Sequence, residues 1–268
     1  MKILLLTGSH PRHLFLVNEL VKTGFVMAHV MEKREEFLPQ PPADLESVDR
    51  VNFIRHFMER DEAEQRHFEG QDKVSVILPT LDVTKQQLNS VETIKWVKRQ
   101  QFDLAISYGV HKLSDELLEA LGGNAWNIHG GLSPWYKGNT TLFWPFYMLR
   151  PNWAGMTIHR LSSRLDAGEI VHHSVPQLAY GDGLHDVACK AVIQVANDLT
   201  KIITTLKLEE INYIPQKGNG KLWIGTDWIP QHLRFVYNTY NNDIVDQFLD
   251  GKLTKIDPPL VSAFSKGE

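Results

Sequence analysis

Two polar side chains that could act together on a carbonyl group lie two residues apart. Asn127 and His129 belong to W-N-I-H-G-G, which is predicted to end a β-strand, so both side chains leave the same face of a sheet. An amide donates a hydrogen bond without charge, and an imidazole can carry a proton near neutral pH. Such a pair can stabilise an oxyanion and move a proton. The glycines at 130 and 131 let the backbone approach closely whatever the two side chains hold.

A carboxylate that could complete this site occurs about forty residues later. Asp166 lies in R-L-D-A-G-E-I, on a short predicted loop between strand-like runs at 155–161 and 170–175. A carboxylate beside the imidazole could orient the ring or favour its charged form. Taken singly, the asparagine could cap a loop, the histidine could be a core residue, and the aspartate could cap a turn.

The pattern N-I-H-x-x-L-x-P-x-x-K-G, followed by L-D-x-G-x-I, resembles the folate-dependent formyltransferases. The resemblance covers roughly residues 2–206. It implies that Asn127, His129 and Asp166 are the catalytic set, and that 10-formyltetrahydrofolate is the formyl donor to a primary amine. With the lysine and glycines of both motifs in place, the joint pattern favours catalysis over three unrelated structural roles.

The resemblance also implies which residues contact the folate. In the family, the segment after the predicted strand 102–108 lies against the pterin, and its register is kept because Leu113 precedes Asn127 by fourteen residues. The implied cofactor-binding residues are Tyr108, Gly109, Val110, Leu113, Leu165 and Gly168. A plain core role for Val110 and Leu113 is the alternative.

Candidate contacts to the amine-bearing substrate come from three places. The turn at 8–13 faces the carboxyl ends of the predicted parallel strands, where helix amides, Arg12 and His10 could bind a phosphate, although a solvated turn is the alternative. Lys137 and Gly138 belong to the first motif. Trp223 lies in an aromatic-rich region and could stack on a nucleotide base, although packing against the core also explains it.

No metal site is predicted. Three histidines, at 159, 172 and 173, lack a second cluster of Cys, His or carboxylate at ligand spacing, so ordinary structural roles are favoured for them. Cys189 lies in a predicted helix without a base partner, so a covalent intermediate is not required.

The order of elements predicts an α/β fold. Alternating strands and helices indicate a Rossmann-like, mostly parallel sheet with helices on both faces, in a catalytic domain over residues 1–206. An insertion at about 34–72 carries a helix whose apolar face is Val48, Val51, Ile54 and Met58, and residues 74–79 resume the sheet. Residues 207–268 form a small appendage, with a β-hairpin turning at Asn219-Gly220 and helices at 229–240 and 242–249.

Composition excludes several classes of protein. Hydrophobic residues are 43% and charged residues 22% of the 268, which is typical of a globular protein. No apolar run approaches the roughly 20 residues of a membrane span. The net charge of −4 argues against a nucleic-acid partner, and the single cysteine fits a reducing cytoplasm.

The choice of amine depends on the appendage. It is too short and too little basic for a methionyl-tRNA module, and the first loop differs from that of glycinamide ribonucleotide transformylases. What remains resembles the sugar N-formyltransferases, which act on nucleotide-linked aminodeoxy sugars for polysaccharide biosynthesis. Alternatives are transfer to one of the other two amines, or a catalytically silent folate- or nucleotide-binding protein. The family's habit of pairing through this region, together with the edge of the predicted hairpin, predicts a homodimer.

Overall fold

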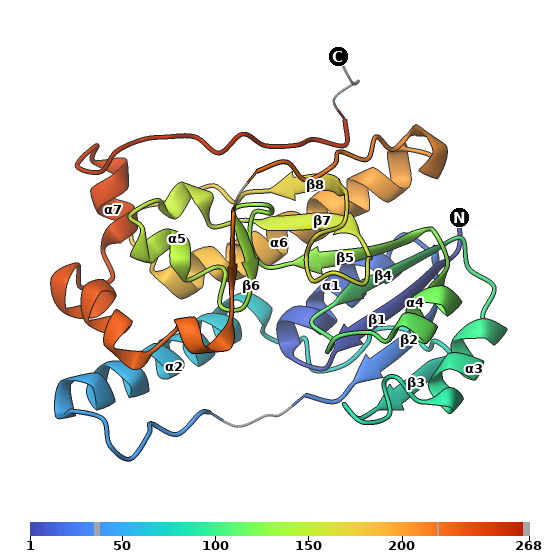
Figure 1. The fold of residues 1–268 in the computed structure, drawn as a ribbon, viewed down its shortest axis with the longest axis horizontal. Helices are drawn as coiled ribbons and strands as arrows, with labels where there is room; N and C mark the ends of the chain where they lie inside the picture. Colours follow the sequence, from blue (N-terminus) through green and yellow to red (C-terminus); the bar gives the residue numbers. More distant parts are fainter. Residues whose placement is uncertain (35–37, 219, 265–268) are drawn as a thin grey trace.

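A seven-stranded sheet crosses the centre of the computed structural model, which describes residues 1–34, 38–218 and 220–264 (Figure 1). The spatial order is β3-β2-β1-β4-β5-β7-β8. The first five strands of this order pair in parallel, whereas β7 pairs antiparallel with both β5 and β8, so the predicted mostly parallel sheet is confirmed. The strands are β1 Ile3–Gly8, β2 Val26–Glu32, β3 Thr80–Val83, β4 Leu104–Tyr108, β5 Ala125–His129, β7 Met156–Arg160 and β8 Ile170–Ser174.

Helices cover both faces of this sheet, as β1 shows. Its run of apolar residues is buried throughout, which is typical of a parallel strand between two layers. Ile3 and Leu5 join the cluster that includes side chains of α1 (Pro11–Val21) and α6 (Leu184–Thr205). The alternate residues pack into the other cluster, with side chains of α3 (Val91–Arg99) and α4 (Asp115–Leu121). The three-layer arrangement brings the carboxyl ends of the parallel strands to one edge.

The helix predicted in the 34–72 segment exists as α2 (Ser47–Phe68), but its predicted apolar face is wrong. Val48, Val51, Ile54 and Met58 are exposed, between 37% and 64%. The inward face carries polar side chains that are paired. Asp49 accepts from Arg234 at 2.6 and 2.7 Å, Asn52 donates to Asn238 at 2.7 Å, and His56 contacts Tyr237 at 3.0 Å. Residues 35–37 of the predicted insertion lie outside the described residues.

The third strand does not lie where the apolar run predicts it. The run at 74–79 precedes β3, and Ile77 is fully exposed. Pairing with β2 begins at Thr80, directly after Pro79, which has no amide hydrogen to contribute to a ladder. The apolar residues of this run therefore do not resume the sheet.

The predicted hairpin is also wrong. Within the described residues, β9 (Lys221–Trp223) pairs in parallel with β6 (Tyr136–Gly138), which directly follows the motif loop, residues 130–135. Ile214 instead bridges to Ile170 in β8. Asn219 of the predicted turn lies outside the described residues. The pairing fastens the C-terminal region to the motif loop, and the homodimer prediction loses the hairpin edge on which it partly rested.

The predicted C-terminal helices are shorter and less regular than expected. A 3-10 turn (Pro230–His232), a π-helical segment (Arg234–Thr239) and α7 (Ile244–Leu249) replace two continuous helices. The apolar and aromatic residues at 140–149, which are typical of a buried helix, form only the single turn α5 (Trp144–Tyr147). Side chains from these segments and from Phe53 of α2 share one apolar cluster. No helix among residues 1–34, 38–218 and 220–264 is long and apolar enough to cross a membrane. The domain boundary at 206/207 stays a prediction.

Candidate functional site

The three predicted catalytic residues meet at the carboxyl end of β5. Asn127 and His129 leave the same face of this strand, and Asp166 approaches from the loop between β7 and β8. The Nδ1 atom of His129 lies 3.4 Å from Oδ2 of Asp166. The aspartate also accepts a 2.9 Å hydrogen bond from the amide of Gly138. The fold therefore brings together side chains that are forty residues apart in the sequence.

A fourth side chain, His159, joins Asn127 to Asp166. Asn127 and His159 are cross-strand neighbours, because β5 and β7 pair antiparallel in this register. The Nε2 atom of His159 lies 3.3 Å from Nδ2 of Asn127 and 3.6 Å from Oδ1 of Asp166. From the sequence, an ordinary structural role is predicted for His159, and its place beside Asn127 and Asp166 is a finding of the structure. Its signal was a histidine in the strand that leads to the aspartate loop.

The hydrogen bonds of His159 fix the orientation of the Asn127 amide. Its Nδ1 lies 2.8 Å from the carbonyl of Arg160, which only accepts, so Nδ1 carries a hydrogen and Nε2 is the nitrogen that can accept. Asn127 must then turn its NH2 group toward His159. Its carbonyl oxygen accepts from the hydroxyl of Ser107 at 2.7 Å. One N–H of Asn127 remains for a ligand.

His129 is held as a neutral ring at rest. Burial lowers its pKa, and this outweighs the opposing effects of the Asp166 carboxylate and of the Tyr136 carbonyl. That carbonyl lies 2.8 Å from Nε2, so Nε2 carries the hydrogen and Nδ1, which faces Asp166, is the basic atom. The expected influence of Asp166 is in the predicted direction, but desolvation is larger.

Asp166 is held as a carboxylate in a strained backbone conformation. Burial alone would raise the pKa of Asp166, but the neighbouring His159 and His129 rings and the amide of Gly138 lower it on balance. Its φ of 47° is uncommon for a residue with a side chain. Gly138 is constrained as well, because a Cβ there would lie 2.1 Å from the carbonyl oxygen of Trp223.

Two cavities meet at these residues. The first, of about 300 Å³, is lined by the segment 107–113 that follows β4, by Asn127, and by the loop 161–166. It contains five of the six predicted cofactor-binding residues, namely Tyr108, Gly109, Val110, Leu113 and Leu165. The sixth, Gly168, is not part of its lining. A Cβ at Gly168 would lie 1.8 Å from the carbonyl oxygen of Arg160, so this glycine permits close backbone packing.

The second cavity, of about 580 Å³, extends from the same point in another direction. Its lining includes side chains of α1, α2 and α6 and the aromatic rings of Phe143 and Trp228. His129, Gly130 and Gly138 line both cavities. The third cavity, of about 760 Å³, shares Arg12 with the second and has His10 in its lining.

The predicted substrate contacts are therefore only partly brought to the site. Gly138 lines the junction, and Arg12 lines the second cavity while its guanidinium pairs with Glu64 at 2.6 Å. Lys137 is not among the residues that line these three cavities. Trp223 is 9% exposed, stacks on Trp144 at 3.9 Å and has the Lys221 ammonium over its ring, so base stacking finds no support. It is a core residue of the C-terminal region.

Solved structures share this fold. A formyltransferase, PseJ, from Anoxybacillus kamchatkensis, in complex with UDP-4,6-dideoxy-4-formamido-L-AltNAc and tetrahydrofolate, is 19% identical, with a TM-score of 0.52 over 91% of this chain and 96% of that chain. An N-formyltransferase from Helicobacter canadensis, with folinic acid and dTDP-3-aminofucose, is 14% identical, with a TM-score of 0.55 over 90% and 82%. A phosphoribosylglycinamide formyltransferase from Anaplasma phagocytophilum is 16% identical, with a TM-score of 0.53 over 84% and 97%. At these identities the likeness establishes the fold.

A family model provides the assignment that the structures alone do not. The model described as formyl transferase matches residues 46–196, which is more than half of the chain. The match includes β4, β5 and the β7–β8 loop, and so contains all the residues that meet at the junction of the cavities. This chain belongs to the formyl transferase family.

Proposed function

We propose that this enzyme transfers a formyl group from 10-formyltetrahydrofolate to the primary amine of a nucleotide-linked aminodeoxy sugar. The observation that carries the proposal is the shared wall of the two cavities, where His129 and Gly138 face both. A transferase needs a place for its donor and another for its acceptor, with the transferred carbon between them. The basic Nδ1 of His129 and the spare N–H of Asn127 lie at this wall.

The first cavity suits a folate. Its lining combines backbone of the segment 108–113 with the side chains of Val110, Leu113, Leu118 and Leu165. Backbone donors and acceptors along an apolar wall suit a flat heterocycle that carries its own donors and acceptors at the edge. The cosubstrate, when bound, supplies a formyl group on a nitrogen that can leave. The residues of this wall would hold the ring system, with Asn127 and Asp166 at the inner end.

In the reaction, Asn127 would donate its remaining N–H to the formyl oxygen as the acceptor amine bonds to the carbon. This interaction strengthens as the oxygen becomes negative. His129, uncharged at rest, would accept the proton that the amine loses, at Nδ1. Asp166 stabilises the imidazolium that forms, because a carboxylate 3.4 Å away favours the charged ring. His129 then returns the proton to the departing nitrogen as its bond to the formyl carbon breaks.

The second cavity supports a large, amphipathic acceptor. Its lining combines the aromatic side chains Phe57, Phe143 and Trp228 with the cationic side chains Arg12 and Arg60. A nucleotide-linked sugar presents a base, a sugar and a diphosphate, which match aromatic and cationic surfaces. Two of the similar structures are complexes with a nucleotide-linked sugar.

The test is an acceptor panel. The purified protein is incubated with 10-formyltetrahydrofolate and nucleotide-linked 3-amino and 4-amino sugars on dTDP, UDP and GDP, and the products are identified by mass. We expect formylation of at least one member. Formylation of glycinamide ribonucleotide or methionyl-tRNA, with no sugar converted, would exclude the proposed acceptor class.

Replacing His159 should lower turnover by about tenfold, because the Asn127 amide would lose the bond that orients it, a term of about 1–2 kcal/mol. His159→Phe keeps a buried ring without the acceptor nitrogen, whereas His159→Gln places an oxygen near the former Nε2. We expect the glutamine variant to recover part of kcat, and KM for the folate to stay unchanged in both. Equal kcat in the wild type and His159→Phe would rule out this positioning role.

A further inference from the structure

Arg60 of α2 lies on the wall between the second and third cavities. Its side chain is half-buried, lines both cavities, and places its guanidinium carbon 4.8 Å from the ring centre of Phe57. The second cavity leads from this arginine to His129. An anion bound to Arg60 would therefore belong to the molecule whose amine reaches the catalytic junction.

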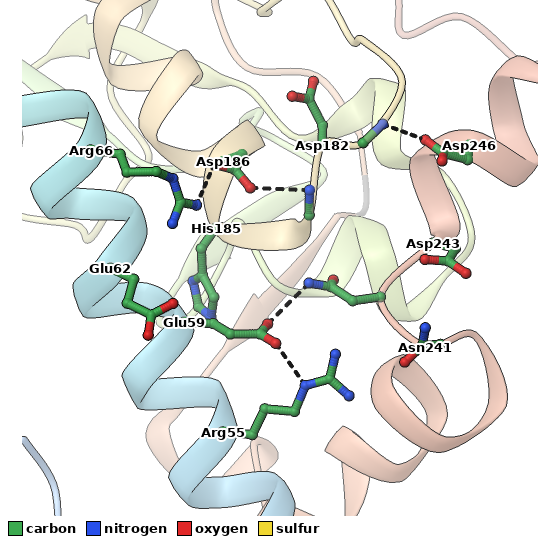
Figure 2. Close-up of a pocket in the computed structure, with 13 residues that line it drawn as sticks. Arg55, Glu59, Glu62, Arg66, Asp182, His185, Asp186, Asn241, Asp243 and Asp246 are labelled. Atoms are coloured by element: carbon green, nitrogen blue, oxygen red, sulfur yellow. Dashed lines mark hydrogen bonds and ion pairs between the residues drawn. The ribbon is translucent and has the colours of Figure 1, made fainter.

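Neighbouring arginines of α2 are paired, and Arg60 is not. Figure 2 shows Arg55 bonded to Glu59 and Arg66 bonded to Asp186, in the lining of another cavity. Within the described part of the chain, Arg60 makes no ion pair or hydrogen bond to a carboxylate. Arg55 therefore pairs within α2 and Arg66 joins α2 to α6, whereas Arg60 is left for another partner.

The nearest carboxylate in the sequence pattern is already used. Glu64 lies one turn after Arg60, at the spacing that favours an ion pair on a helix. Its carboxylate instead binds Arg12 of α1 at 2.6 Å. Burial lowers the pKa of Arg60, against the opposing influence of Glu64 and Asp61. A cation that is partly desolvated without a close counter-ion costs free energy that an anionic ligand would offset.

A second polar side chain in the lining of the second cavity has a nitrogen without a protein partner. The imidazole of His13 is 3% exposed, and its Nδ1 atom makes no hydrogen bond with any described residue. The ring sits between Gly8 and Gly109, where an added Cβ would lie 2.4 and 2.2 Å from its nitrogens. The glycines thus provide space for a buried ring that lines the second cavity and still has hydrogen-bonding capacity.

We propose that Arg60 and His13 bind the diphosphate of the acceptor substrate, with Arg60 supplying the charge and His13 a neutral hydrogen bond. The proposal rests on the proposed function, and it moves the main anion contact from Arg12, which Glu64 neutralises, to a residue of α2. A guanidinium suits this task because its planar donors match two phosphate oxygens at once. Aromatic contact with Phe57 holds the guanidinium in place.

The test uses inorganic pyrophosphate and the intact acceptor as separate probes. Binding of pyrophosphate to the wild type, Arg60→Gln, Arg60→Lys and His13→Phe is measured by calorimetry at low ionic strength. Arg60→Gln should weaken binding by about ten- to a hundredfold, and His13→Phe by about tenfold. Arg60→Lys should recover part of the loss, since it keeps the positive charge but not the planar pair of donors. Arg99→Gln, which removes an exposed charge of α3, is the matched control.

Formyl transfer separates this inference from the proposed function. With a converted sugar acceptor, Arg60→Gln should raise KM for the acceptor about tenfold or more, with kcat and KM for the folate little changed. An unchanged acceptor KM would overturn the role of Arg60 while leaving the acceptor class intact. If no sugar is converted, the pyrophosphate binding measurement alone tests the role of Arg60. Loss of binding in Arg60→Gln supports the anion site, and equal or undetectable binding in the wild type and the variant overturns it.

Discussion

Asn127→Ala should lower kcat for formyl transfer by about a hundred- to a thousandfold, the usual effect of removing one oxyanion donor. The expectation follows from the bonding of the amide. Ser107 and His159 occupy its oxygen and one of its hydrogens, so the other hydrogen is directed at the ligand. The loss should appear in kcat and in kcat/KM equally, because the interaction strengthens only as charge develops on oxygen. Steady-state kinetics with saturating folate and acceptor measure it.

The control for this variant is Asn152→Ala. Asn152 is a half-buried amide that donates to the carbonyl of Ile256 and lies outside the cavities that meet at the site. It should turn over like the wild type. Thermal melting and folate binding of Asn127→Ala should also match the wild type, which separates a chemical loss from a folding defect. Near-normal turnover in a folded Asn127→Ala would show that the oxyanion is stabilised elsewhere.

The placement of this chemistry could be predicted because parallel strands confine ligand sites to one edge of a sheet. The spacing of Asn127 and His129 placed them on one face at a strand end, and the second motif put Asp166 on a loop. His159 could not be assigned a role from sequence, because its contact depends on the antiparallel register between β5 and β7. That register is a tertiary property.

The incorrect predictions share one cause, which is packing between segments that are distant in the sequence. Helical periodicity placed α2 correctly, but which face it buries depends on Arg234, Tyr237 and Asn238, nearly two hundred residues away. The Asn-Gly hairpin signal was overridden because β9 finds a partner in β6. Trp223 is not available to stack on a ligand, because Trp144 stacks on its ring, and the sequence does not reveal this contact. Local patterns predict elements well, whereas choices between possible partners need the fold.

Acid should destabilise this protein at an unusually high pH, because several of its histidines are buried without charge. Burial lowers the pKa of His29 and of His173 to about 4, and that of His185 to about 3. In the unfolded chain each returns to about 6.5. Between these values the unfolded state binds more protons than the folded state, so stability is full above about pH 6.5 and falls as the pH decreases through this window.

The size of the effect follows from the shifts. Each of the three histidines should lower the free energy of unfolding by about 2 kcal/mol at pH 5 relative to pH 8, or by about 6 kcal/mol together. The free energy of unfolding of a typical domain is roughly 5–15 kcal/mol, so much of the stability would be lost at pH 5. Urea unfolding at pH 8, 7, 6 and 5 measures this dependence. His29→Leu removes a ring bonded to Thr7 at 2.8 Å. In this variant the unfolding free energy should change about one third less between pH 8 and pH 5 than in the wild type, whatever its stability at pH 8. An unfolding free energy that is flat from pH 7 to pH 5 would mean that these rings are charged, or solvated, in the folded protein.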